Sequence, residues 1–275
     1  MNVGVPLLTT RLSLDYPGKP DVLREAVLEI LPGETVGLIG GSGSGKSSMA
    51  LALLGLAYLK GGVTRGEVRF HGQDLLRAGE REMRSIRGRR MAFVPQSPMS
   101  ALNPAMRIGG QMVEAWKAHQ RGDRSEWMPE IQRSLEQVGL PSEASFLRRY
   151  PAEISVGQAQ RVLIATAILH GPELLIADEP TSSLDAIAHA EILRLLLRLN
   201  RELGMACLYI SHDLLSVASF CRRAAILHQG HIVEQAETER LFRAPAHPYT
   251  RALLDAMPVR PELSYKVPDE CILAS

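Results

Sequence analysis

A glycine-rich segment, GGSGSGKS, spans residues 40–47 and has the composition of a phosphate-binding loop. It fits the pattern G-x-x-x-x-G-K-[ST], with an apolar run before it and helix-forming residues after it. Glycines let the backbone wrap a phosphate with its N–H groups pointing inward, and the following helix start adds its dipole. The sequence therefore predicts a nucleotide site. Its candidate contact residues are Gly40, Gly41, Ser42, Gly43, Ser44, Gly45, Lys46, Ser47 and Ser48.

Two side chains of this loop add chemistry that glycine cannot supply. Lys46 brings a positive charge for the β- and γ-phosphates, and the Ser47 hydroxyl can hold Mg²⁺. The alternative is a flexible glycine loop before a helix. The complete motif and its flanking segments favour nucleotide binding with Mg²⁺ as the cofactor.

An acidic pair ends a second apolar run, LLIADE at 174–179. Ligands of open parallel sheets bind beyond the carboxyl ends of the strands, which is where this pair is expected. Asp178 can bind Mg²⁺ through water, and Glu179 can polarise an attacking water. An acidic turn before Pro180 is the alternative, but the phosphate loop favours catalysis.

His212 follows a third apolar run, ACLYI at 206–210. A lone histidine is commonly a surface or packing residue. This one is expected at the same edge of the sheet as the phosphate loop, so a contact with the γ-phosphate is the favoured hypothesis.

The stretch EISVGQAQR, residues 153–161, resembles the start of a helix. Ser155 and Gln158 have the spacing of a capping box, and a capped helix end can present N–H groups to an anion. Taken alone, the stretch indicates a helix start and no more.

The elements that must position these residues alternate between helices and strands. After residue 158, helical patterns alternate with apolar runs, which indicates a parallel sheet covered on both faces. Short apolar runs in 7–39 predict strands, and amphipathic stretches in 97–150 predict a helical insert. The predicted strands are 35–40, 173–180 and 206–213, with a strand and turn at 66–75 and a hairpin at 224–236. The predicted helices are 47–56, 130–140, 158–170 and 186–203.

Bulk properties narrow the class of protein. The chain has 275 residues and a formal net charge of +1, so no basic field is present to hold nucleic acid. Three cysteines without paired spacing suggest a reducing compartment and no disulfide framework. The longest apolar runs, such as 49–58, are too short to span a bilayer. A membrane role is therefore expected to come through partners.

Taken in order along the chain, the motifs resemble those of the ATP-binding cassette (ABC) ATPases, over roughly residues 7–258. The resemblance implies a P-loop NTPase of the α/β class. Its core sheet would be mostly parallel, with an N-terminal antiparallel β subdomain and an α-helical insert. It also implies that two cassettes dimerise head to tail, with ATP between the phosphate loop of one and the signature segment of the other.

The resemblance assigns further roles to single residues. Tyr16 takes the place of the aromatic residue that stacks on adenine, and Gln96 that of a glutamine that reaches Mg²⁺ and links the nucleotide to membrane subunits. SSLD at 182–185 resembles the family's D-loop. Three signature residues would contact ATP on the partner cassette: Ser155, Gly157 and Gln158. Lys46, Glu179 and His212 would carry the catalysis of ATP hydrolysis.

Val156 departs from the family pattern, which has glycine at this position of the signature segment. If the backbone there is helical, valine fits without strain. If the position needs a positive φ, valine is strained.

A narrower resemblance concerns the segment SPMSALNP at 97–104 and the tail LFRAPAHPYTRALLDAMP at 241–258. Both are similar to ATPases of peptide and nickel importers. This implies permease subunits, an extracytoplasmic solute-binding protein and a peripheral place on the cytoplasmic face of the inner membrane. Peptides, nickel or metal-chelating small molecules are the expected cargo.

An ABC-type ATPase of a soluble complex, such as the assembly that breaks carbon–phosphorus bonds, is the alternative function. The expected layout has an ATPase domain at 1–258, a helical subdomain at about 97–165, an extension at about 238–258 and a loose tail at 259–275. Cys271 alone cannot hold an iron–sulfur cluster, so none is expected. The pair His228 and His231 is interpreted as a surface turn, because two histidines make a weak metal signal.

Overall fold

The computed structural model describes residues 5–257. The chain forms two compact units, one from the residues up to Leu76 together with those from Leu208 onward, and the other from Arg77–Cys207. The tail 259–275 and Cys271 lie outside the described residues. Among residues 5–257, no helix combines the length and apolar character that crossing a membrane requires.

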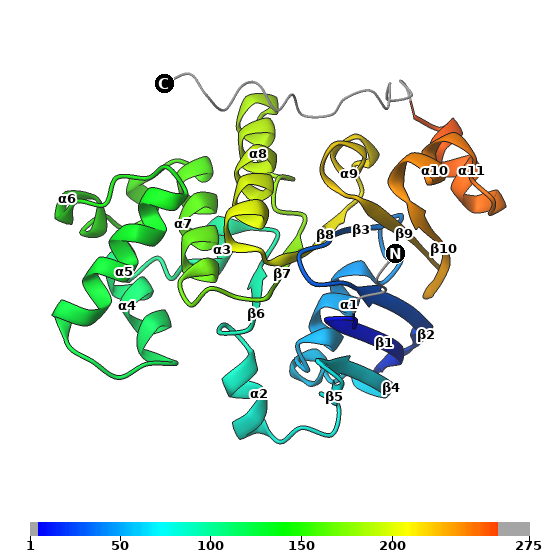
Figure 1. Ribbon diagram of the computed structural model, residues 1–275, viewed down its shortest axis with the longest axis horizontal. Coiled ribbons are helices and arrows are strands. Elements are labelled where there is room, and N and C mark those ends of the chain that lie inside the picture. The colour runs from blue at the N-terminus through cyan, green and yellow to red at the C-terminus, as the bar shows by residue number, and fades with distance from the viewer. Residues whose placement is uncertain (1–4, 258–275) are drawn as a thin grey trace. The chain divides into compact units, whose positions relative to one another are not determined.

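An antiparallel sheet forms the N-terminal part of the first unit (Figure 1), as the sequence predicts. Its order is β2-β1-β4-β5. Along β1 every second side chain is buried, which is the pattern of a sheet with one face on a core. The strands are β1 (Leu8–Tyr16), β2 (Lys19–Ile30), β4 (Val63–Phe70) and β5 (Gln73–Asp74).

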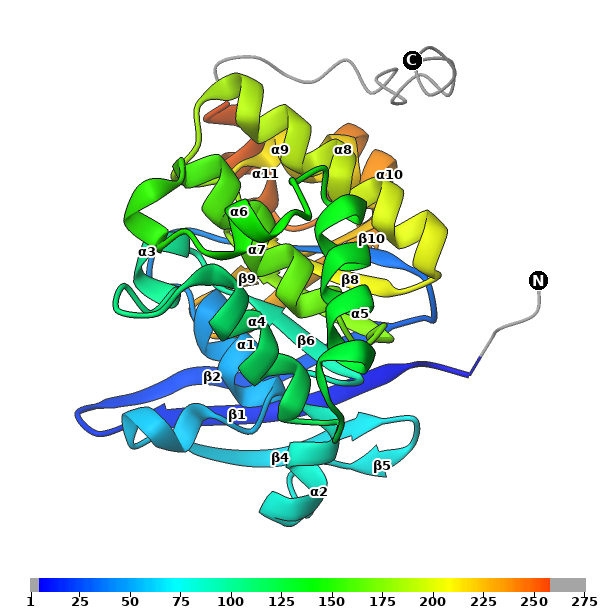
Figure 2. The ribbon, with the colours of Figure 1, turned by 90° about the vertical axis from the view of Figure 1, so that its left-hand side faces the viewer.

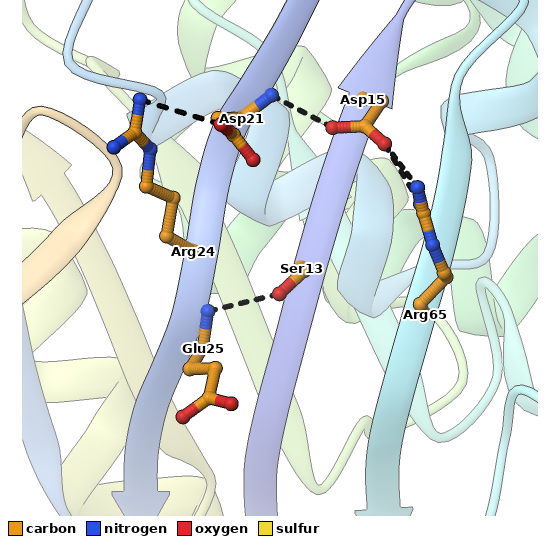
Figure 3. Close-up of polar contacts among 6 residues, drawn as sticks. All are labelled: Ser13, Asp15, Asp21, Arg24, Glu25 and Arg65. Atoms are coloured by element: carbon orange, nitrogen blue, oxygen red, sulfur yellow. Dashed lines mark hydrogen bonds and ion pairs between the residues drawn. The ribbon is translucent and has the colours of Figure 1, made fainter.

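Strand β2 is bent by two irregularities in its pairing with β1. Asp21 and Glu25 have left-handed φ values of 58° and 42°, which bulged positions permit. Polar side chains of β1 accept their N–H groups: Ser13 Oγ binds Glu25 N at 2.9 Å, and Asp15 Oδ1 binds Asp21 N at 2.7 Å (Figure 3). The bulges therefore keep their backbone groups hydrogen-bonded.

A second sheet in the first unit runs in the order β10-β9-β3-β8. β3 pairs in parallel with β9, and β9 and β10 form the predicted antiparallel hairpin. β3 is buried at every position, which explains its continuous apolar run. The strands are β3 (Thr35–Ile39), β8 (Ala206–Ser211), β9 (Arg223–His228) and β10 (His231–Glu237). The helices are α1 (Lys46–Leu53), η1 (Ala57–Lys60), α9 (Leu214–Phe220), α10 (Thr238–Arg243) and α11 (Pro248–Asp255).

The second unit contains the predicted helical insert and two parallel strands. β6 (Met91–Val94) pairs with β7 (Leu174–Asp178). Helices α4, α5 and α7 pack against one another (Figure 2) around buried side chains such as Trp116, Ile131 and Leu135. The helices are α2 (Glu80–Ile86), α3 (Pro98–Ala101), α4 (Ile108–Lys117), α5 (Arg124–Gln137), α6 (Ala144–Leu147), η2 (Pro151–Glu153), α7 (Val156–Ile168) and α8 (Ala186–Leu203).

Several helix boundaries differ from the predictions, most of all those of α5, which spans Arg124–Gln137 instead of the predicted 130–140, because Asp123 caps it earlier. α7 begins at Val156, two residues before the predicted start at 158, because Ser155 is its N-cap and helical geometry begins directly after the cap. α1 ends at Leu53 where the apolar pattern predicted 56, and Gly55 follows with a left-handed φ of 61°. A left-handed glycine is a common way for a helix to end.

Candidate functional site

The phosphate-loop candidate joins β3 to α1 in the first unit and is wound tightly around its glycines. Gly45 has φ 107°, and a Cβ there would lie 2.8 Å from the carbonyl oxygen of Val22. A Cβ at Gly40 would lie 2.4 Å from the carbonyl oxygen of Leu227. Any side chain at these two positions would displace backbone, so the loop depends on glycine at both.

Lys46 lies at the start of α1 and is only 7% exposed. Its Nζ donates hydrogen bonds to the carbonyl oxygens of Gly40 at 2.9 Å and Gly41 at 3.1 Å. The hydroxyl of Ser44 is buried and has no hydrogen-bond partner within the described structure. Because a buried orphan hydroxyl is costly, its presence beside a buried ammonium fits a loop built to receive an anion.

Tyr16 ends strand β1, and its ring packs on the turn before β4. A Cβ at Gly62 would lie 2.7 Å from Tyr16 Cε1, so the turn leaves room for the ring by carrying glycine. The neighbouring Asp15 accepts hydrogen bonds from the Arg65 guanidinium and from Asp21 N, which fixes the end of the strand (Figure 3). The Tyr16 hydroxyl is buried, while the side chain as a whole is half-buried.

His212 follows β8, the neighbour of β3 in the first unit. Its side chain is exposed. The next residue, Asp213, caps α9 by accepting from Leu215 N at 3.0 Å. His212 therefore stands at a fixed point between a strand end and a helix start, with its imidazole accessible.

The acidic pair stands at the end of β7 in the second unit. Asp178 is the last strand residue and is 6% exposed. Glu179 has a left-handed φ of 46°, which is uncommon for a residue with a long side chain. Such conformations cluster at functional sites.

A hydrogen bond joins two of the predicted site residues within the second unit. Gln96 Nε2 donates to Glu179 Oε2 at 2.9 Å. The strands explain the contact, because Val94 of β6 pairs with Ala177 of β7 and both residues follow these strand ends. The spacing of the motifs along the sequence does not predict this contact. With its amide N–H engaged, Gln96 keeps its carbonyl oxygen for another ligand, such as a cation.

The segment after Glu179 is also held locally. Ser182 donates from N and Oγ to the carbonyl oxygen of Glu179, at 3.2 and 3.1 Å. Asp185 caps α8 by accepting from Ile187 N at 3.0 Å and Ala188 N at 2.9 Å. The predicted D-loop is therefore a turn fixed between an acidic strand end and a helix cap.

The start of α7 carries the predicted signature residues. Gln158 N donates to Ser155 Oγ at 3.2 Å, and Ser155 N donates to Gln158 Oε1 at 3.1 Å, which is the predicted capping box. Val156 is the first helical residue, and its side chain is 39% exposed. The position is helical and needs no positive φ, so valine fits without strain. A Cβ at Gly157 would meet nothing within 4 Å, so this helix start faces open space.

Sequence reasoning missed one neighbour of the phosphate loop. A Cβ at Gly41 would lie 3.5 Å from the hydroxyl of Tyr249, and the Tyr249 ring stacks on His228 with centroids 3.6 Å apart. Both residues occur in motifs that the sequence makes visible, HPYT and HQGH. Nothing in their spacing indicated that they meet beside the loop.

Each unit holds groups of a kind that phosphoryl transfer to water requires. The first unit holds a wound glycine loop with a buried ammonium, and the second holds a carboxylate that can orient water. The described residues contain no cluster of three or more His, Cys, Asp or Glu side chains that could hold a metal by themselves. A divalent cation would therefore depend on hydroxyl, amide and single carboxylate ligands, the oxygen donors that Mg²⁺ prefers.

Comparison with known families gives two matches. The ABC transporter family matches residues 23–182. The family described as oligopeptide/dipeptide transporter, C-terminal region, matches residues 233–269.

Among curated proteins, the chain is 45% identical over 226 residues to the dipeptide transport ATP-binding protein DppD of Escherichia coli (strain K12), covering 82% of this chain and 69% of that protein. It is 41% identical over 242 residues to the glutathione import ATP-binding protein GsiA of Escherichia coli O157:H7. That match covers 86% of this chain but 39% of GsiA, so the chain spans well under half of that relative.

Among solved structures, the fold resembles the dimeric post-hydrolysis state of the ATP-binding cassette MJ0796 bound to ADP and Pi. The TM-score is 0.72 at 26% identity, covering 84% of this chain and 98% of the other. The predicted α/β cassette fold is thereby confirmed.

Proposed function

This chain belongs to the ABC transporter family of ATPases, and we propose that it drives an importer for peptides or related small solutes. The observation that carries the importer assignment is the match of residues 233–269 to the C-terminal region of oligopeptide/dipeptide transporters. The names of the relatives agree, since they describe dipeptide transport and glutathione import. Nickel is a less supported cargo than peptides.

In the proposed site, ATP is the substrate and its phosphates lie in the loop of residues 40–48. The loop's N–H groups, together with the α1 helix start and the Lys46 ammonium, stabilise phosphate charge. Tyr16 stacks on the adenine, and His212 contacts the γ-phosphate. Mg²⁺, when bound, neutralises charge on the phosphates, and Ser47, Gln96 and Asp178 would hold it, Asp178 through water.

Glu179 orients the attacking water and accepts its proton. Its left-handed backbone and its bond from Gln96 fix where the carboxylate lies. Gln96 then has two roles, one toward the cation and one toward the catalytic carboxylate. It is also the point at which the nucleotide's state can be relayed to membrane subunits.

The site is completed by a second cassette, either another copy of this chain or a sister ATPase. Ser155, Gly157 and Gln158 would face ATP held by that partner. The exposed, capped start of α7 supports this, because its N–H groups and hydroxyl are presented away from their own unit's core.

The proposed partners beyond the second ATPase are permease subunits and, through them, an extracytoplasmic solute-binding protein. The proposed place is the cytoplasmic face of the inner membrane, held through the permease. We further propose that residues 1–258 form the ATPase domain, with the helical subdomain at about 97–165 and the extension at about 238–258. The soluble carbon–phosphorus lyase alternative gains no support from the relatives.

The decisive variant is Glu179→Gln, which keeps the shape of the side chain and removes its charge. It should bind ATP normally and hydrolyse it at least about 100-fold more slowly, because only the transition state loses an interaction. Glu202→Gln, an exposed carboxylate of α8, is the matched control and should leave turnover unchanged. Near-normal turnover in Glu179→Gln would overturn the catalytic assignment, while failure to co-purify with permease subunits would overturn the importer assignment alone.

A further inference from the structure

The C-terminal extension is tied to the β9–β10 hairpin by a single carboxylate. Glu234 of β10 accepts from Ala246 N at 2.7 Å and from His247 N at 3.0 Å. Burial by itself would raise the pKa of Glu234, but the neighbouring Thr250 hydroxyl and these two N–H groups outweigh it and lower the pKa. The ionised carboxylate therefore holds the turn that leads into α11 throughout the neutral range.

Helix α11 then starts in a defined position. His247 caps it by accepting from Tyr249 N at 3.2 Å. Thr250 is 0% exposed and Leu254 is 4% exposed, so the inner side of the helix packs into the first unit. Tyr249 lies between the cap and this packed side, and its backbone N–H is bound by the His247 ring.

The Tyr249 ring reaches the phosphate loop. It stacks on His228, the last residue of β9, with an interplanar angle of 22°. A Cβ added at Gly41 would lie 3.5 Å from the Tyr249 hydroxyl, so the hydroxyl borders this part of the loop. The residue before His228 also borders the loop, because a Cβ added at Gly40 would lie 2.4 Å from the Leu227 carbonyl oxygen.

Gly40 and Gly41 are the two residues whose carbonyl oxygens bind Lys46 Nζ. A shift of these peptides would therefore move the ammonium and turn the loop's N–H groups. Binding is stronger when the receiving groups are ordered before the ligand arrives, because less conformational freedom is lost on binding.

We propose that Tyr249 is a positioning residue for the phosphate loop, and that the C-terminal extension thereby sets the affinity of this cassette for ATP. Tyr249 touches no reacting atom. It supports Gly41 from outside and is itself supported by His228 and by the turn that Glu234 holds. This role rests on the proposed use of the loop as the ATP site.

The test measures ATP affinity and steady-state hydrolysis in the full chain with its partners. Tyr249→Ala should raise both Kd and KM for ATP about 5- to 10-fold and leave kcat within about 2-fold, because support of the loop is lost but Glu179 is untouched. Tyr249→Phe keeps the stacked ring and loses only the hydroxyl, the atom nearest Gly41, so it should raise Kd and KM in the same direction by a smaller factor, about 2- to 5-fold. Ala252→Ser, at an exposed position on the same helix, should match the unaltered chain.

The outcomes separate this inference from the proposed function. If the unaltered chain binds ATP and Lys46→Ala does not, the loop is the ATP site. Equal Kd and KM in Tyr249→Ala and the unaltered chain would then overturn the positioning role alone. A fall in kcat with unchanged KM would overturn it too. If Tyr249→Ala melts early, Tyr249→Phe and His228→Ala decide, and unchanged affinity in both would contradict the proposal.

Discussion

Two helix starts in this protein are candidates to meet the phosphates of ATP, and they are built in opposite ways. The start of α1 is wound through glycines with φ of 76° at Gly43 and 107° at Gly45, and its lysine is buried. The start of α7 has an ordinary capping box and an exposed valine as its first helical residue. The glycine loop before α1 would have to enclose a phosphate. The start of α7 would need only to present its N–H groups to a phosphate.

The difference explains which residues each site can tolerate. Enclosing a phosphate requires peptides turned inward, and left-handed glycines allow this. Presenting a helix end requires only the free N–H groups that every helix start has. Val156 is therefore compatible with the start of α7. A residue with a side chain in place of Gly45 would not be compatible with the loop before α1.

The largest effect is expected from Gly45→Ala. The new Cβ would lie 2.8 Å from the Val22 carbonyl oxygen at a φ of 107°, so the loop must distort. The unfolding free energy should fall by about 1–3 kcal/mol, and ATP binding should be lost. Thermal melting and ATP titration measure the two effects.

Gly157→Ala is the matched variant at the other helix start. Its Cβ would meet nothing within 4 Å in this chain, so the unfolding free energy should stay within about 1 kcal/mol of the original. ATP binding to the single chain should be retained, while hydrolysis should fall because, in the proposed dimer, the new methyl would face the partner's nucleotide. Equal loss of ATP binding in Gly45→Ala and Gly157→Ala would show that the two helix starts do not differ in their need for glycine.

A smaller effect is expected from Ser155→Ala. Removing the N-cap hydroxyl should lower the unfolding free energy by about 1 kcal/mol, and loss of a contact to the partner's ATP should slow hydrolysis about 10-fold. Steady-state ATPase rates at saturating ATP provide the measurement.

Asp123→Ala controls for the loss of a cap without the loss of a phosphate contact. Asp123 closes a capping box at the start of α5, accepting from Ser125 N at 2.8 Å. This variant should melt earlier yet hydrolyse ATP at the original rate. If Ser155→Ala behaves the same way, the start of α7 is a helix cap and nothing more.

The smallest effect is expected from Val156→Gly. Glycine costs up to about 1 kcal/mol relative to other residues in a helix, and less at its first position. Because the position is already helical, hydrolysis should change by no more than about 2-fold. A large gain in ATPase rate would mean that valine strains the signature segment when the dimer closes.

Much of this organisation is predictable from local sequence. The phosphate loop, the acidic strand end and the capping box each follow from residues within ten positions of one another, and their chemistry is local. Burial on both faces makes β3 and β7 continuous apolar runs, so these strands are also visible in the sequence.

Contacts between distant segments are not predictable in this way. Gln96 and Glu179 meet because β6 and β7 are paired, and no single-sequence pattern specifies that pairing. Tyr249 meets the phosphate loop because Glu234 fixes a turn 12 residues away in the chain. The left-handed backbone at Glu179 is likewise not indicated by the residue type, since glutamate rarely adopts a positive φ.

The bond between Gln96 and Glu179 has a kinetic consequence. A carboxylate has about four acceptor sites, so one bond from the Gln96 amide to Oε2 orients the group and still leaves it able to accept a proton from water. On the proposed assignment, hydrolysis would be slower while this bond is open, because the carboxylate would then lose its fixed direction. Gln96 lies just before α3, so a movement of that helix would change turnover through Gln96 and Glu179 while the phosphate loop stays as it is. The position of one short helix would then set the rate of ATP hydrolysis.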